Sequence, residues 1–406
     1  EPGVVDMDFG DAPDRPYPTL LANNGARHIV GRLFMGARVD AETNGQPTVL
    51  ADGDDLNPPI GLDDEDGVVF NTALIGNVPS TVNVTCSSTG YVNAWIDFNI
   101  DGDWADAHEQ ILTDVPVGAG VNTLPFFVPG LTNGQTYARF RLSSAPGLSY
   151  AGLAPDGEVE DYVVHLEPLK WLQKPDLNPT GVDVDNHFWL ADDFLCTQTG
   201  PITDIHLWGS FEGDILPPAV LTNMTFTLVL YSDVAANPNE PGSYSHPGQP
   251  LCTMTFGPGQ YGAGLCAQIP PPGEWWHTPP QLWIPGADRH CYQFDFYLDR
   301  TNACRQIEGT IYWLAVKYQG PAGADVRFGW KSSYEQWHDD ACWLDPTGPA
   351  PIWRPLVYGD GHPWGAQEPP RSMDLAFALS GEPGVVDMDF GDAPDRPYPT
   401  LLANNG

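Results

Sequence analysis

Short stretches in which hydrophobic and polar residues alternate run through the first part of the chain. They lie at Thr81–Cys86, Tyr91–Phe98, Thr136–Ser143 and Asp161–Leu166. In the second stretch the apolar residues, which are Val92, Ala94, Ile96 and Phe98, share one face, because neighbouring side chains of a strand point to opposite sides. This pattern predicts half-buried antiparallel strands. A short helix is predicted only at Ala105–Leu112.

The second part of the chain contains further segments typical of strands. They lie at Asp204–Phe211, Met224–Val234, Cys291–Asp299, Gly309–Gln319, Val326–Ser333 and Met373–Gly381. The 43 glycines and 42 prolines indicate many turns between short strands. We therefore predict an all-β chain of two β-sandwich or jelly-roll domains, at 1–166 and 182–381, joined by a linker at 167–181.

The two ends of the chain carry the same sequence. Residues 1–25 and 382–406 both read EPGVVDMDFGDAPDRPYPTLLANNG, at an offset of 381 residues. An unaltered copy indicates a young duplication or a tandem array, because surface positions of old copies drift apart. We predict that residues 382–406 begin the next unit of a repeat. End-to-end stacking of two compact domains would give one unit per roughly 80 Å.

Charge excludes some partners and favours others. The chain has 53 acidic and 17 basic residues, a formal net charge of −36. Such a field repels nucleic acid and anionic membranes and attracts cations. No apolar run is long enough to cross a bilayer, so no membrane insertion is expected. No signal peptide is visible, and Glu1 is interpreted as a mature terminus left by cleavage.

The seven cysteines are unevenly distributed, with Cys86 alone and six between Cys196 and Cys342. Their spacing fits no metal motif, so disulfides in an oxidising compartment are expected. Six cysteines allow 15 pairings. The pairs favoured by closeness in sequence are Cys252–Cys266 and Cys291–Cys304, with Cys196–Cys342 remaining. Cys86 is expected to be a buried thiol.

The sharpest pattern for chemistry is DFNIDGDWADAHE at Asp97–Glu109. Calcium prefers six to eight oxygen ligands, and the D-x-[DN]-x-D-G spacing supplies them from a short loop. An EF-hand would place a glutamate at the twelfth position, where His108 stands, and the preceding element is a strand. We therefore predict a calcium loop outside a true EF-hand, against the alternative of a solvated acidic turn. Its candidate ligands are Asp97, Asn99, Asp101, Asp103, Asp106 and Glu109.

Three further acidic clusters lie in the same domain. They contain Asp6, Asp8, Asp11 and Asp14; Asp52, Asp54, Asp55, Asp63, Asp64, Glu65 and Asp66; and Asp156, Glu158, Glu160 and Asp161. Each alone is typical of a solvated face, but together they repel one another unless cations neutralise them. We expect at least one further cation site. Its candidate ligands are Asp8, Asp11, Asp64, Asp66, Glu158, Glu160 and Asp161.

Several motifs of the first domain resemble the GEVED domain family. They include DMDFGDAPDRPYPTL, NAWIDFNIDGDW, TYARFRLSS and DGEVEDYVV, and the resemblance covers roughly residues 6–166. It implies a module of large secreted bacterial proteins, found near adhesive or cell-surface modules, without an established catalytic role. The second domain resembles an uncharacterised domain of similar secreted proteins, through KWLQKPDL, LADDFLCT and GTIYWLAV.

The leading hypothesis is a non-enzymatic, calcium-stabilised repeat unit of an extracellular bacterial fibre or giant cell-surface protein, in head-to-tail contact with identical units. A carbohydrate-binding adhesin is the alternative, because exposed tryptophans stack on sugar rings. The tryptophans expected to be exposed lie in the predicted loops at 274–280 and 353–364. A glycoside hydrolase needs two facing carboxylates, for which Asp192–Asp193 and Asp339–Asp340 are candidates, beside His338 as a base or ligand.

Overall fold

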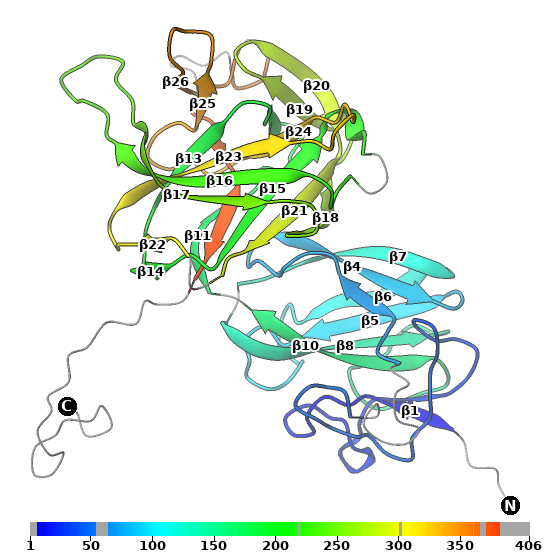
Figure 1. The fold of residues 1–406 in the computed structure, drawn as a ribbon. Coiled ribbons are helices and arrows are strands. Elements are labelled where there is room, and N and C mark those ends of the chain that lie inside the picture. Colours follow the sequence, from blue (N-terminus) through cyan, green and yellow to red (C-terminus); the bar gives the residue numbers. More distant parts are fainter. Residues whose placement is uncertain are drawn as a thin grey trace, which may run out of the picture.

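The computed structural model describes residues 6–53, 64–130, 132–166, 168–216, 220–299, 303–359, 361–365 and 371–381. They form two β-sandwich domains that lie one against the other (Figure 1). The predicted all-β class is confirmed. The helical elements of the described ranges are two single turns, η1 (Leu21–Asn23) and η2 (Glu212–Asp214). The second copy of the repeated segment, 382–406, lies outside the described residues.

The first domain has its core between two antiparallel sheets. One has the order β10 (Glu158–Leu166), β8 (Gly134–Ser143), β5 (Gly90–Ile96), β6 (Gln110–Val117). The other has the order β3 (Val68–Phe70), β4 (Pro79–Cys86), β7 (Gly120–Phe127). Val84, Ala94 and Phe140 are fully buried between them. All four strands predicted here are present, whereas Ala105–Leu112 is a loop followed by β6.

The outer face of β5 and β8 is buried as well, so the half-buried strand predicted at 91–98 is wrong. The N-terminal segment covers this face and contributes a small sheet of β1 (Met7–Phe9), β2 (Arg27–Ile29) and β9 (Leu153–Ala154). Trp95 and Tyr137 pack there against Ala12 and Tyr17. The covering segment comes from elsewhere in the chain and leaves no periodic signal in the strand it covers.

Arg139 of β8 fixes this covering layer. Its guanidinium forms an ion pair with Asp161 of β10 at 2.6 Å, and both side chains are completely buried. The same guanidinium donates to the carbonyl of Pro18 at 2.6 Å and to the hydroxyl of Thr19 at 3.2 Å. A buried ion pair of this kind is stable only while both partners and their hydrogen bonds are present. The N-terminal segment is therefore an integral part of the first domain.

The second domain packs a large sheet against a six-stranded one. The large sheet has the order β11 (Leu169–Gln173), β28 (Phe377–Ser380), β15 (Asp204–Phe211), β24 (Phe328–Ser333), β12 (Val182–Asp185), β19 (Glu274–Thr278), β20 (Leu282–Asp288), with β18 (Gly262–Gln268), β21 (His290–Tyr297) and β27 (Asp374–Leu375) branching from it. The other contains β17 (His246–Phe256), β16 (Thr225–Val234), β23 (Ile311–Gln319), β13 (Leu190–Leu195), β25 (Cys342–Asp345) and β26 (Ile352–Pro355). A short pair, β14 (Gly200–Pro201) and β22 (Arg305–Gln306), completes the domain. Aromatic residues such as Phe226, Phe294 and Phe328 fill the space between the sheets.

The predicted linker at 167–181 is wrong in part, because Leu169–Gln173 forms strand β11. This strand pairs antiparallel with β28, so Leu169 lies opposite Ser380. Gly381 N–H then donates to the carbonyl of Pro168 at 3.4 Å. The prolines around β11 suggested a linker, but this strand forms its hydrogen bonds with β28, the last strand of the domain in sequence. The chain therefore leaves the second domain beside the point where it enters.

The two domains touch through the segment before β4. The backbone N–H of Ala73 donates to Asp295 at 3.0 Å, and Gln293 donates to the carbonyl of Ala73 at 3.0 Å. Ile75 and Val78 are buried in the same cluster as Trp208. Together these contacts hold the first domain against β15 and β21.

The described residues contain one disulfide, Cys252–Cys304, which corrects all three predicted pairs. Cys266 and Cys291 are instead neighbours on β18 and β21, where the Cys266 thiol donates to the carbonyl of Cys291 at 3.2 Å. Closeness in sequence cannot reveal which strands become neighbours in a sheet. Cys86 is a buried thiol, as predicted.

Thiol counting tests this arrangement. Non-reduced protein, unfolded in denaturant with an alkylating reagent present, is expected to gain five labels, because five cysteines have free thiols. Full reduction should raise the number to seven, the cysteine content of the chain. Intact mass spectrometry measures both numbers. A single label before reduction would indicate three disulfides and contradict the five free thiols.

Candidate functional site

The predicted calcium loop is the connection of a hairpin, between β5 and β6. The N–H of Ile96 donates to the carbonyl of Glu109 at 2.9 Å and closes the base of the loop. One carboxylate oxygen from each of Asp97, Asp101 and Glu109 lies within 4.8 Å of the other two. These three residues could therefore share one ion.

Backbone hydrogen bonds fold the loop around Asp97. Its carboxylate accepts the N–H of Ile100 at 2.6 Å and that of Gly102 at 3.0 Å. Gly102 has φ +94°, in the left-handed region, and a Cβ there would lie 2.6 Å from Pro16. Glycine at this position thus permits both the sharp turn and close packing against the N-terminal segment.

Glu109 reaches the group although it stands one residue beyond the EF-hand position. His108 has φ +77°, and this turn accommodates the extra residue. One oxygen of Glu109 accepts the N–H of Asp106 at 3.1 Å, and the other has no hydrogen-bond donor among the described residues. The side chain is only 2% exposed. Burial, and then repulsion from Asp97, raises the pKa of Glu109 to about 7.

The remaining loop candidates are exposed and bind one another. Asn99 donates to Asp106 at 2.7 Å and to Asp101 at 3.2 Å, and Asp103 accepts the N–H of Ala105 at 2.8 Å. The structure therefore brings three of the six predicted ligands together and leaves the other three at the rim of the loop.

The sequence pattern did not identify the residue that covers the site. The Tyr17 hydroxyl donates to Asp97 at 2.6 Å, and its ring packs 4.4 Å from that of Trp104. Tyr17 belongs to the repeated 25-residue segment, so this segment covers the loop at Asp97 and Trp104. The signal available in the sequence was the recurrence of the segment itself.

Glu158 and Glu160 point into the sandwich from β10. Glu158 accepts the N–H of Met35, and Glu160 accepts the N–H of Gly67 at 3.0 Å and the hydroxyl of Tyr162 at 2.8 Å. Burial, followed by repulsion between the two side chains, raises the pKa of Glu158 well above its usual range. Burial raises the pKa of Glu160 to about 8.

Asp8 and Asp64 lie close enough to Glu158 to repel its charge. Asp8 accepts the N–H of Val159 at 2.7 Å, and Asp64 accepts that of Asp40 at 2.9 Å. These two aspartates therefore lie near the glutamates of β10, but among the described residues no three of the four bring carboxylate oxygens within 4.8 Å of one another.

Three other predicted ligands have different partners. Asp161 binds Arg139 through both oxygens, at 2.7 and 2.6 Å, and is therefore not turned toward Glu160. Asp11 accepts the N–H of Gly53 at 2.6 Å, and Asp66 accepts that of Ala37 at 2.8 Å. Strand periodicity already separates Asp161 from Glu160, because adjacent residues face opposite sides.

Two family profiles match the chain. The GEVED domain profile matches residues 91–165, and the profile of a domain of unknown function, DUF7901, matches residues 169–380, more than half of the chain. The chain belongs to the DUF7901 family. The resemblance to GEVED domains is confirmed for residues 91–165 of the first domain, as is the presence of an uncharacterised domain after it.

Other comparisons add little. A SusE-like protein of known structure has 8% sequence identity and a TM-score of 0.15, and the match covers 61% of this chain and 96% of that protein. A likeness at this level carries no argument about function. No curated protein sequence matches the chain. Within the described ranges, no helix has the length and apolar character needed to span a membrane.

The carboxylates proposed for a glycosidase lie in the DUF7901 domain with separate partners. Asp192 accepts hydrogen bonds from Gln173 at 2.8 Å and from the N–H of Leu375 at 2.6 Å. Asp193 lies 2.5 Å from Nδ1 of His338. Asp339 accepts the N–H and the hydroxyl of Ser245. The contacts of Asp192 join β13 to β11 and β27, whereas those of Asp193 and Asp339 involve loop residues.

The tryptophans of the DUF7901 domain are not exposed as the adhesin hypothesis requires. Trp276, Trp313 and Trp330 are fully buried. Six further tryptophans of this domain are buried or half-buried, namely Trp275, Trp283, Trp337, Trp343, Trp353 and Trp364. The predicted loops at 274–280 and 353–364 are wrong in part, because they contain β19 and the end of β26. No exposed tryptophan platform is present in the described part of this domain.

Proposed function

We propose that the chain is a non-catalytic structural repeat unit of an extracellular bacterial fibre or giant cell-surface protein, with a GEVED domain stabilised by calcium. The observation that carries the proposal is the position of the repeated segment. Phe9, Ala12 and Tyr17 are buried in the GEVED domain, and the same residues recur 381 positions later. In a tandem array, the second copy would supply the covering layer of a further GEVED domain.

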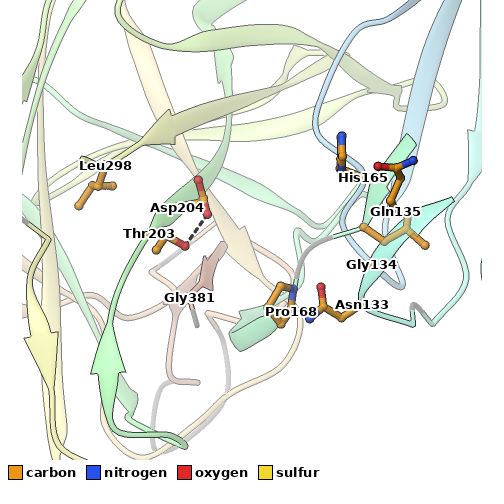
Figure 2. Close-up of a pocket in the computed structure, with 10 residues that line it drawn as sticks. Asn133, Gly134, Gln135, His165, Pro168, Thr203, Asp204, Leu298 and Gly381 are labelled. Carbon is orange, nitrogen blue, oxygen red and sulfur yellow. Dashed lines mark hydrogen bonds between the residues drawn. The ribbon is translucent and has the colours of Figure 1, made fainter. Parts of the chain in front are cut away.

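The ends of the DUF7901 domain support a particular arrangement of such units. Gly381 lies beside Pro168, between the two domains, where both line a cavity of about 380 Å³ (Figure 2). A following unit would start at this junction. In Figure 1 the strand β1 lies at the end of the GEVED domain away from the DUF7901 domain. Successive GEVED domains would then form the axis, and each DUF7901 domain would branch from it.

This arrangement replaces the end-to-end stacking expected from the sequence. A domain of about 165 residues has a diameter near 40 Å from the size scaling of compact domains. Successive units would therefore be spaced by about one GEVED domain, roughly 40 Å rather than 80 Å. A repeated contact that does not close into a ring produces a filament. Electron microscopy of the native assembly tests the proposal, with a regular filament as the expected result and dispersed single units as the contradicting one.

Calcium is the proposed ion because the loop offers only oxygen ligands in the D-x-[DN]-x-D-G spacing. Asp97, Asp101 and Glu109 would bind it, and Asn99 and Asp106 at the rim would complete its coordination. The ion would neutralise carboxylates that otherwise repel one another in a buried position.

The stabilisation by calcium should grow as the pH rises. The pKa of Glu109 is about 7 in the folded protein against an ordinary 4.5. Without the ion, the folded protein keeps a proton that the unfolded chain releases, so its stability falls between these two values as the pH increases. Calcium replaces that proton. The difference in melting temperature between calcium and chelator should be small near pH 5 and larger at pH 7.5. An equal difference at both pH values would contradict the role of Glu109.

A further inference from the structure

A second group of carboxylates is buried in the DUF7901 domain, on four neighbouring strands of the large sheet. Asp183 on β12 lies opposite Lys331 on β24. On the next two strands, Glu274 at the start of β19 lies opposite Asp288 at the end of β20. All four side chains are buried, with exposures of 0 to 2%. Sheet pairing thus brings together four charged residues that are far apart in the sequence.

Lys331 forms hydrogen bonds with only some of these carboxylate oxygens. Its ammonium donates to Oδ2 of Asp183 at 2.5 Å and to Oε2 of Glu274. While all three carboxyl groups are ionised, neither oxygen of Asp288 has a hydrogen-bond donor among the described residues, and Oε1 of Glu274 has none. A hydrogen bond between Asp183 and Asp288 requires a proton on one of them. One oxygen from each of the three carboxylates lies within 4.8 Å of the other two.

The charges do not balance. Three carboxylates and one ammonium leave an excess of two negative charges in the domain interior. Buried charge without a partner is strongly unfavourable, so the group needs either two protons or one divalent cation. A single ion of charge +2 would neutralise the group, while Lys331 keeps its two hydrogen bonds.

We propose that Asp183, Glu274 and Asp288 bind one hard divalent cation of the calcium class. The three residues supply carboxylate oxygens, the ligands that such ions prefer. Asp288 offers both of its oxygens, and Ser210 lies next to Asp183 and adds a hydroxyl. The site rests on residues of the DUF7901 domain alone and does not depend on the proposed fibre or on the GEVED loop.

The isosteric change Asp288→Asn distinguishes the cation from shared protons. Full-length protein is equilibrated with calcium, passed through a desalting column and measured by elemental mass spectrometry. Asp288→Asn is expected to lose one bound calcium per chain and to melt at a lower temperature. The control Asp204→Asn, another buried aspartate on the same sheet, should keep the full calcium content. An unchanged calcium content in Asp288→Asn, with equal or higher stability, would overturn the proposal in favour of shared protons.

A measurement on the unaltered protein covers the case in which Asp288→Asn fails to fold. Crystals of the full chain grown with calcium, measured at a long X-ray wavelength, should show an anomalous peak between Asp183, Glu274 and Asp288. Carboxylates in the same arrangement without a peak would overturn the proposal. A peak here with none in the loop at Asp97–Glu109 would support this site and contradict the GEVED one, so the two can fail separately.

Discussion

Removing calcium should lower the melting temperature of the GEVED domain by roughly 8 to 16 °C. An ion present at a thousand times its dissociation constant stabilises the folded state by about 4 kcal/mol. For a domain of this size, each kcal/mol shifts the melting temperature by about 2 to 4 °C. The loss is expected because Asp97, Asp101 and Glu109 then face one another without a cation, two of them buried. Scanning calorimetry in calcium and in chelator measures the shift.

Two aspartates of the same loop provide a matched pair of variants. Asp101→Ala should remove most of the response to chelator, because Asp101 belongs to the close group of three. Asp103→Ala should keep most of it, because this exposed side chain caps the N–H of Ala105 and lies outside the group. A melting curve of the unaltered protein that chelator leaves unchanged would contradict calcium binding at this loop.

Deleting residues 1–25 should abolish the cooperative unfolding of the GEVED domain and spare the DUF7901 domain. The deletion removes Tyr17, which donates to Asp97, and uncovers Trp95 and Tyr137. It also removes the Thr19 and Pro18 acceptors of the buried Arg139. Each lost hydrogen bond to a charged group costs about 1.5 to 3 kcal/mol, to which the lost apolar burial adds. At low protein concentration, calorimetry should then show only the transition of the DUF7901 domain.

The second copy of the segment can replace the deleted one. A chain that lacks only residues 1–25 still carries the same sequence at 382–406. We expect it to associate with other copies as concentration rises, because the segment of one chain can complete the GEVED domain of the next. A chain that lacks both copies should stay monomeric, and a synthetic peptide of residues 1–25 should restore its first transition. If this double deletion melted like the full chain, the segment would have no structural role.

Local sequence patterns predicted the strands well and the layers around them poorly. Alternation at Tyr91–Phe98 identified the buried face of β5, because that face packs on a regular sheet. It missed the opposite face, where Trp95 lies under the N-terminal segment. The same limit applies to β11, whose hydrogen bonds come from β28 at the far end of the domain. Contacts between distant segments leave no mark on the pattern of either segment.

The candidate sites differ in the same way: a site formed within one segment was predictable, and a site formed by several segments was not. The loop at Asp97–Glu109 was predictable because its ligands are close in sequence and its spacing follows the geometry of the ion. The order of residues could not show that a turn at His108 brings Glu109 into the group. The group of Asp183, Glu274 and Asp288 was missed altogether, because its members come from three strands and are far apart in the sequence. Only sheet register brings them together.

The spacing of units in the native assembly tests the central claim most directly. Electron microscopy of the assembled protein, with the GEVED domains labelled by an antibody fragment, measures the distance between successive domains of this kind. The account predicts a regular filament with GEVED domains about 40 Å apart along the axis and DUF7901 domains projecting from it. Dispersed single units would contradict the proposed function. A spacing near 80 Å, with both domains in the axis, would contradict the arrangement derived from the neighbouring positions of Pro168 and Gly381.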